Sequence, residues 1–178
     1  MKSDRELVEL ANQGDPNAFE ALYYRYRDWV YRLAWRFTGD HQEALDVLQE
    51  TFIYLLGKFP GFELTASMTT FLYPTVRHTS MAVRAKKNRF ASDDEVLGEL
   101  EASDHKEPTD NGRTELAIVL TLLPHEQREI LLMRFVDDMN LQEIAIALNL
   151  PLSTIKSKLY RALRTLRDDR RTQDYFLE

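Results

Sequence analysis

Apolar residues recur at helical spacing through most of this chain, and strong helix start and stop signals bound each run. Asp15 followed by Pro16 is a typical N-cap and first helical residue, and Gly39 is a typical helix end. Between them, apolar side chains return every three or four residues, which places them on one helical face. Asp40 and Glu43 then form a capping-box pattern that predicts a second helix directly afterwards.

The same signals continue to about residue 168. After a break at residues 57–67, which hold two glycines and a proline, a long helix is predicted over residues 68–90. Pro124 opens another helix, and no stretch alternates like a strand. The prediction is an all-α protein of two small bundles, residues 1–90 and 114–178.

Residues 91–113 are predicted to be a flexible acidic linker between the bundles, because they lack helical periodicity and are rich in Asp, Glu, Ser and Gly. The formal net charge of −6 is therefore segregated. Residues 74–90 carry five Lys or Arg and no acid, and residues 151–171 carry seven against two acids. Salt screens exposed charges beyond about 8 Å, so a nucleic acid would respond to these local basic patches.

The composition excludes several classes of protein. With 44% hydrophobic and 29% charged residues, the chain can bury a core. It has no cysteine, which excludes disulfides and thiolate metal sites and favours a reducing compartment. The start, "MKSDRELVEL", lacks the apolar core of a secretion signal, and no apolar run approaches the roughly 20 residues that span a bilayer. We expect a cytoplasmic protein without membrane insertion.

The stretch "NLQEIAIALNLPLSTIKSKLYRALRTLR", from Asn140, predicts two short helices joined at "NLP", as in a helix-turn-helix. Asn140 and Glu143 cap the first helix, and Pro151 suits the first turn of the second. N-terminal residues of a recognition helix reach base edges, and longer cations reach phosphates. The outward residues expected to bind DNA are Ser153, Thr154, Lys156, Ser157, Lys158 and Arg161. The alternative is a helical hairpin with a solvated basic face.

Patterns typical of catalysis are absent from the sequence. The four histidines are scattered, the glycines form no phosphate-binding loop, and there is no nucleophile elbow. We therefore expect no enzyme, no metal, no cofactor and no small-molecule substrate.

Aromatic residues crowd the first ninety positions, and most of them fit core positions. Phe71 and Tyr73 lie just before a basic stretch, where aromatic rings can also stack unpaired bases, a contact worth about 1–3 kcal/mol each. The basic residues that follow them are Arg77, Arg84, Lys86, Lys87 and Arg89.

Two segments resemble domains of one known family. "DPNAFEALYYRYRDWVYRLAWRFTGDHQEALDVLQETFIYLLGKF", followed by "TTFLYPTVRHTSMAVRAKKNR", resembles the promoter-melting domain of bacterial sigma factors. "LLPHEQREILLMRFVDDMNLQEIAIALNLPLSTIKSKLYRALRTLR" resembles the domain of that family that binds the upstream promoter element. Their order and short linker are similar to the extracytoplasmic-function group.

The resemblance implies a subunit that binds core RNA polymerase and promoter DNA and is commonly controlled by an anti-sigma factor. The helix like "ALDVLQETF" would dock on polymerase, with the contact candidates Asp46, Gln49, Glu50 and Phe52. The alternative for this helix is a plain solvated face. The helix of residues 68–89 would meet the melted downstream element, through Phe71, Tyr73, Arg77, His78, Arg84, Lys86, Lys87 and Arg89. The preceding loop, residues 59–67, would help to capture flipped bases.

The sequence departs from the family pattern at this base-capture region. The family commonly has Trp-Leu-Tyr, then Arg-Asn, then an Asp four positions on, where this chain has Phe71-Leu72-Tyr73, Arg77-His78 and Ala82. An interior proline costs a helix about 3 kcal/mol, so Pro74 predicts a kink or a restart near Tyr73. The captured base and the ease of melting are where we expect this chain to differ.

Two other functions stay open at this point. A stand-alone helix-turn-helix regulator would dimerise and bind a two-fold-symmetric site without polymerase. An adaptor that kept the fold but lost melting would bind polymerase and work only on a pre-melted promoter.

Overall fold

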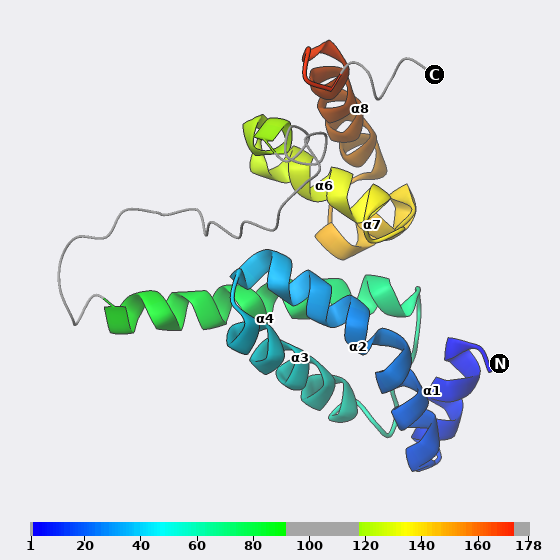
Figure 1. Cartoon of the computed structure of the whole chain (residues 1–178). Helices are drawn as coiled ribbons and strands as arrows, with labels where there is room; N and C mark the ends of the chain where they lie inside the picture. Colours follow the sequence, from blue (N-terminus) through cyan, green and yellow to red (C-terminus); the bar gives the residue numbers. More distant parts are fainter. Residues whose placement is uncertain (1, 92–117, 173–178) are drawn as a thin grey trace. The chain divides into compact units, whose positions relative to one another are not determined.

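The computed structural model describes residues 2–91 and 118–172, with side chains as far as residue 86 in the first stretch, and every regular element there is a helix (Figure 1). The helices are α1 (Asp4–Asn12), α2 (Pro16–Thr38), α3 (His41–Leu56), α4 (Met68–Ala91), α6 (His125–Phe135), α7 (Leu141–Leu148) and α8 (Leu152–Asp168), and residues 118–122 are also helical. The chain divides into two compact units, Met1–Ser103 and Asp104–Glu178. The all-α prediction is confirmed. The predicted linker begins at the last residue of α4 and otherwise lies outside the described residues.

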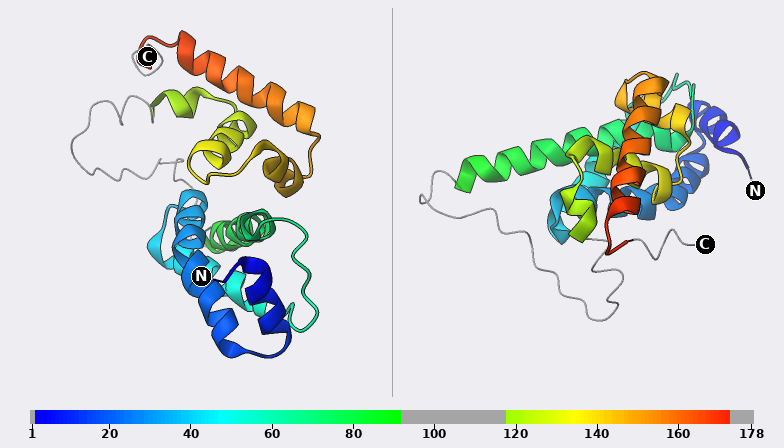
Figure 2. Two further views of the ribbon diagram at one scale, coloured as in Figure 1. Left: turned by 90° about the vertical axis from the view of Figure 1, so that its right-hand side faces the viewer. Right: turned by 90° about the horizontal axis from the view of Figure 1, so that it is seen from above.

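In the first unit, α1, α3 and α4 all pack against α2, and α3 also packs against α4 (Figures 1 and 2). The predicted ends of α2 are confirmed. Asp15 accepts a hydrogen bond from a backbone N–H of the first turn, and Gly39 adopts a left-handed conformation with φ 71°. Leu22, Val30 and Leu33 on the inner face of α2 are at most 1% exposed. The four helices therefore share one apolar core.

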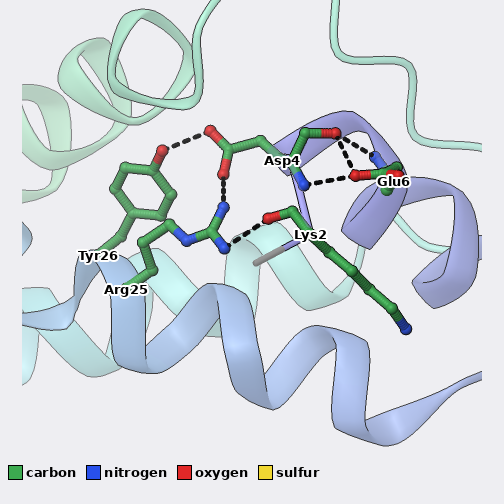
Figure 3. A network of polar contacts seen from close by, with 6 residues as sticks. Lys2, Asp4, Glu6, Arg25 and Tyr26 are labelled. Atoms are coloured by element: carbon green, nitrogen blue, oxygen red, sulfur yellow. Dashed lines mark hydrogen bonds and ion pairs between the residues drawn. The ribbon is translucent and has the colours of Figure 1, made fainter.

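A polar network fastens the start of α1 to α2 (Figure 3). Asp4 accepts hydrogen bonds from the guanidinium of Arg25 and the hydroxyl of Tyr26. Arg25 also donates to the backbone carbonyl of Lys2 at 2.8 Å. Burial, together with the hydrogen bond to Asp4, raises the pKa of the Tyr26 hydroxyl. With a capping box at Ser3, this network holds α1 at a defined place on the bundle.

α4 runs without interruption over its whole length although Pro74 lies inside it (Figure 1). The uninterrupted helix excludes the predicted restart near Tyr73, and a kink there stays a prediction. Pro74 has no N–H to bond to the carbonyl of Thr70, and its ring crowds that carbonyl. Leu72, Tyr73 and Val76 around it are completely buried, and this packing stabilises the turn in helical form. The C-terminal part of α4 extends past α2 and α3 as a helical arm (Figures 1 and 2).

The second unit is a helix-turn-helix in which α6 and α7 both pack against α8. Asn140 starts α7 with the predicted capping box. Asn149 ends it in the left-handed conformation with φ 52°, and Pro151 then precedes α8. Ile144 and Ile155 are completely buried between these helices. Local capping signals thus set both ends of the turn, and the apolar faces set how the helices pack.

Replacing Pro74 by Ala should raise the free energy of unfolding by about 1–3 kcal/mol, because an interior N–H becomes available to the Thr70 carbonyl. Pro74 is exposed, so the change opens no cavity. Urea unfolding followed by circular dichroism measures the difference. Pro16→Ala is the matched control, since Pro16 is the first residue of α2 and its nitrogen has no helical partner. The two variants should differ by more than about 1 kcal/mol, and equal effects would contradict the argument.

Candidate nucleic-acid interface

α8 presents the predicted DNA-binding residues on the side opposite its buried stripe. Ile155, Leu159, Ala162 and Leu166 form that stripe and are at most 6% exposed. The outward residues of α8 are exposed at Ser153, Lys156, Ser157 and Arg161, and half-buried at Thr154 and Lys158. Hydroxyls therefore lie near the N-terminus of the helix and cations along its outer turns.

Lys158 has an ion-pair partner within the second unit. Its ammonium donates to the carboxylate of Glu126 in the first turn of α6. This hydrogen bond, and then the positive charge of Lys158, lower the pKa of the Glu126 carboxyl. A phosphate can therefore bind Lys158 only by displacing Glu126 or by sharing the Lys158 ammonium with it. Glu126 and Lys158 are 32 residues apart in sequence, and only the packing of α6 on α8 brings them together. The sequence alone therefore does not reveal Glu126 as the partner of Lys158.

The predicted basic residues of α4 are exposed or half-buried as far as residue 86: Arg77, His78, Arg84 and Lys86. Arg84 donates to the carbonyl of Phe37 at 3.1 Å, near the C-terminal end of α2. A cation at a helix C-terminus satisfies a carbonyl that has no helical partner. The side chains of Lys87 and Arg89 lie outside the described residues.

Phe71 and Tyr73 do not share a face of α4, and the prediction that both rings stack bases is wrong for Tyr73. The Tyr73 side chain is completely buried, with its ring edge-on to Phe37 at 6.1 Å between centroids. Phe71 is half-buried and stacks on Tyr54 of α3 at 6.3 Å. Phe62 of the preceding loop packs against Phe71 at 4.7 Å. Residues i and i+2 of a helix point in directions about 200° apart. When the ring of Tyr73 faces the core, the ring of Phe71 therefore faces outward.

α3 carries the predicted polymerase-docking residues Asp46, Gln49 and Glu50 on its exposed side. Phe52 is 5% exposed and packs edge-on against Tyr23 at 4.8 Å, so its assignment as a surface contact is wrong. The sequence analysis missed Ile53, which is 60% exposed. Ile53 is four residues after Gln49 and three after Glu50, so helical spacing alone places it on their face.

A groove of about 470 Å³ lies between α3 and α4. The α3 wall contains the exposed residues Asp46, Gln49, Glu50 and Ile53. The α4 wall contains Thr79, Ala82, Val83 and Lys86. Acids and an amide thus face a cation across the groove. Three of the predicted polymerase-binding residues thus lie across the groove from one predicted DNA-binding residue, Lys86.

Metal chemistry and membrane insertion have no support in the part of the chain that the structure describes. Over residues 2–91 and 118–172, no three His, Asp or Glu side chains are grouped as metal ligands would be. No helix in these ranges is both long and apolar enough to cross a bilayer. The side chains on the exposed faces are cations, carboxylates, hydroxyls, amides, aromatic rings and some aliphatic groups such as Ile53.

Comparison with known proteins matches each unit to a sigma-factor region. The family model of Sigma-70 region 2 matches residues 22–90, and that of Sigma-70, region 4 matches residues 115–166. The ECF RNA polymerase sigma factor SigW of Bacillus subtilis is 26% identical, over 92% of this chain and 94% of SigW. The RNA polymerase sigma factor SigV of the same organism is 30% identical, over 77% of this chain and 81% of SigV.

A solved structure shares the fold. It is the sigma factor RpoE in complex with the anti-sigma factor NepR from Bartonella quintana, which aligns with a TM-score of 0.60 at 19% identity. The alignment covers 84% of this chain and 94% of RpoE. From these matches, the chain belongs to the extracytoplasmic-function group of RNA polymerase sigma factors.

Replacing Lys158 by Ala should weaken binding of the full chain to duplex DNA and reduce the salt dependence by about one phosphate contact. Replacing Glu126 by Gln should strengthen binding about two- to fivefold, because the Lys158 ammonium no longer has a charged competitor. Fluorescence anisotropy across a salt series measures both effects.

The double variant is the control for this pair. If Glu126 acts through Lys158, Glu126→Gln should give little gain once Lys158 is Ala. An undiminished gain would mean that Glu126 repels DNA directly and does not restrain Lys158.

Proposed function

We propose that this chain is a dissociable specificity subunit that binds core RNA polymerase and directs initiation at particular promoters. The pair of matches to regions 2 and 4, in family order on two separate units, carries the proposal. The subunit has no catalytic chemistry of its own, since the polymerase makes the RNA. Its place of action is the cytoplasm, where polymerase and promoter DNA meet.

Within the first unit, residues 1–90 dock on polymerase and open the downstream element. We assign docking to the exposed ridge of α3 formed by Asp46, Gln49, Glu50 and Ile53. The exposed Ile53 supports this choice, because an apolar side chain among polar neighbours is a typical centre of a protein interface. Phe52 supports the ridge from below through its packing on Tyr23.

α4 and the loop before it receive the opened strand. Taking a base out of the stack costs a few kcal/mol, and stacking on an aromatic ring offsets part of that cost. Phe71 with the exposed Tyr54 supplies aromatic surface beside the loop, and the basic arm of α4 supplies charge for the phosphates.

Within the second unit, residues 114–178 bind the upstream element through α8. Ser153, Thr154 and Ser157 are placed to meet base edges near the helix N-terminus, and Lys156 and Arg161 to meet phosphates. Lys158 joins the phosphate contacts by exchanging Glu126 for DNA. We propose that the acidic residues 91–113, of which only residue 91 is among the described residues, act as a tether between these two segments.

Control by an anti-sigma factor is part of the proposal. The RpoE structure that shares this fold contains an anti-sigma factor. Both units of this chain also expose large apolar side chains, among them Leu56 in the first and Phe135 in the second. Such side chains are suited to a protein partner that covers them.

Purified core bacterial polymerase, this chain and duplex fragments of its own genome should yield transcripts from specific start sites that share an upstream motif. Sequencing of the transcripts measures this directly. Core binding with transcription only from pre-melted templates would favour the adaptor. A dimer bound to a symmetric site without polymerase would favour the stand-alone regulator.

The double variant Glu50→Lys with Ile53→Ser should lower affinity for core polymerase about tenfold or more, because it changes both the charge and the apolar centre of the ridge. Both residues are exposed, so helicity should be retained. Titration of labelled chain with core enzyme measures the affinity. Glu9→Lys, a charge reversal at an exposed position of α1, is the control and should bind normally. Normal binding by the double variant would move the docking surface away from α3.

A further inference from the structure

Asn12, the last residue of α1, is hydrogen-bonded to the loop that precedes α4. Its side-chain Oδ1 accepts from the backbone N–H of Gly61 at 2.7 Å and of Phe62 at 3.0 Å. Its Nδ2 donates to the backbone carbonyl of Phe62 at 2.9 Å. These bonds use both lone-pair positions of the amide oxygen and one of its two N–H donors. One side chain therefore satisfies three backbone groups that lie 49 and 50 residues away along the chain.

The loop segment that Asn12 binds is also packed by aromatic rings. Phe62 is 8% exposed and contacts Phe59 at 5.5 Å and Phe71 of α4 at 4.7 Å. Phe59 in turn meets Phe19 of α2 edge-on at 6.0 Å. The aromatic contacts hold the loop against the helices, whereas the directional hydrogen bonds of Asn12 fix the position of the loop backbone at Gly61 and Phe62.

Residues 63–66 of this loop, here called the presenting segment, are held at both ends. At one end, Asn12 holds Phe62. At the other, the Ser67 hydroxyl accepts from the backbone N–H of Thr70 at 3.3 Å and bonds the Thr70 hydroxyl at 2.7 Å. Within the segment, Glu63 and Thr65 are exposed. A short segment between two fixed ends has few conformations, so little entropy remains to be lost when it binds a partner.

Asn12 is itself on a fixed support. α1 is held at its other end by Asp4, which binds Arg25 and Tyr26 of α2 (Figure 3). Leu7 and Val8 between the two ends are each 4% exposed. The position of the presenting segment relative to α2 therefore depends on α1, whose buried face packs on α2.

We propose that Asn12 is a positioning residue for strand opening. Its amide holds the presenting segment where it meets an unpaired nucleobase beside Phe71. The inference rests on the proposed function, in which the first unit opens the promoter. It adds a residue of α1, outside the residues 22–90 that match the region 2 family model, to the parts that govern opening.

The test uses the full chain with core polymerase on a promoter found by transcript sequencing. Asn12→Ala removes all three hydrogen bonds, and Asn12→Asp keeps the two acceptor contacts but cannot donate to the Phe62 carbonyl. Permanganate reactivity of unpaired thymines on the duplex should fall about tenfold for Asn12→Ala and by a smaller factor for Asn12→Asp. Asn17→Ala, at an exposed position of α2, is the control and should behave as wild type.

Two further measurements separate positioning from general loss of structure. Affinity for core polymerase and transcription from a pre-melted template should stay within about threefold of wild type. Amide hydrogen exchange should speed up at Gly61 and Phe62 in Asn12→Ala while the buried amides of α2 stay protected.

Wild-type opening by Asn12→Ala would overturn the inference alone. Equal losses on duplex promoter, pre-melted template and core affinity would also overturn it, because the role of Asn12 would then be structural. If the wild-type chain binds core but opens no promoter, the proposed function fails and the inference fails with it.

Discussion

The first unit depends on burial of one face of α2. Leu22, Val30 and Leu33 are at most 1% exposed, and burial of such side chains contributes roughly 1.5–3 kcal/mol each. Because α1, α3 and α4 all pack against α2, the side of each helix that faces away from α2 is available for contacts with a partner or with a loop. The α3 ridge, the basic arm of α4 and the Asn12 contact all lie on helices whose other side meets α2.

Charge explains how an acidic chain can carry DNA-binding helices. The basic residues are concentrated on α4 and α8, and some of them already have acceptors within the protein. Lys158 binds the Glu126 carboxylate, and Arg84 binds the carbonyl of Phe37. When DNA binds at these positions, each cation exchanges its acceptor in the protein for a phosphate, which lowers the affinity for arbitrary DNA. A lowered affinity for DNA alone suits a subunit that contacts promoter DNA while it is bound to the polymerase.

Sequence reasoning predicted the helices well and individual faces less well. Caps at Asp15, Gly39 and Asn140 act over a few residues, so the pattern alone located those helix ends. The resemblance placed Phe52 on a surface, and the basic residues after Tyr73 suggested the same for Tyr73, but both side chains are buried. Each step along a helix turns the side chain by about 100°, so residues close in sequence can lie on opposite faces. The penalty expected at Pro74 was local, and burial of the residues around it outweighed it. Exposed Ile53 could have been found from its spacing to Gln49.

The sequence by itself determined the all-α class, the helix ends, the helix-turn-helix and the resemblance to sigma factors, because each depends on residues that are close along the chain. Only the tertiary structure decided that Glu126 pairs with Lys158, that Asn12 holds the loop before α4, and that α3 and α4 form one groove. These contacts join residues far apart in sequence. Apolar burial drives helices together but is not directional, so the polar partners that meet depend on how the packed faces fit.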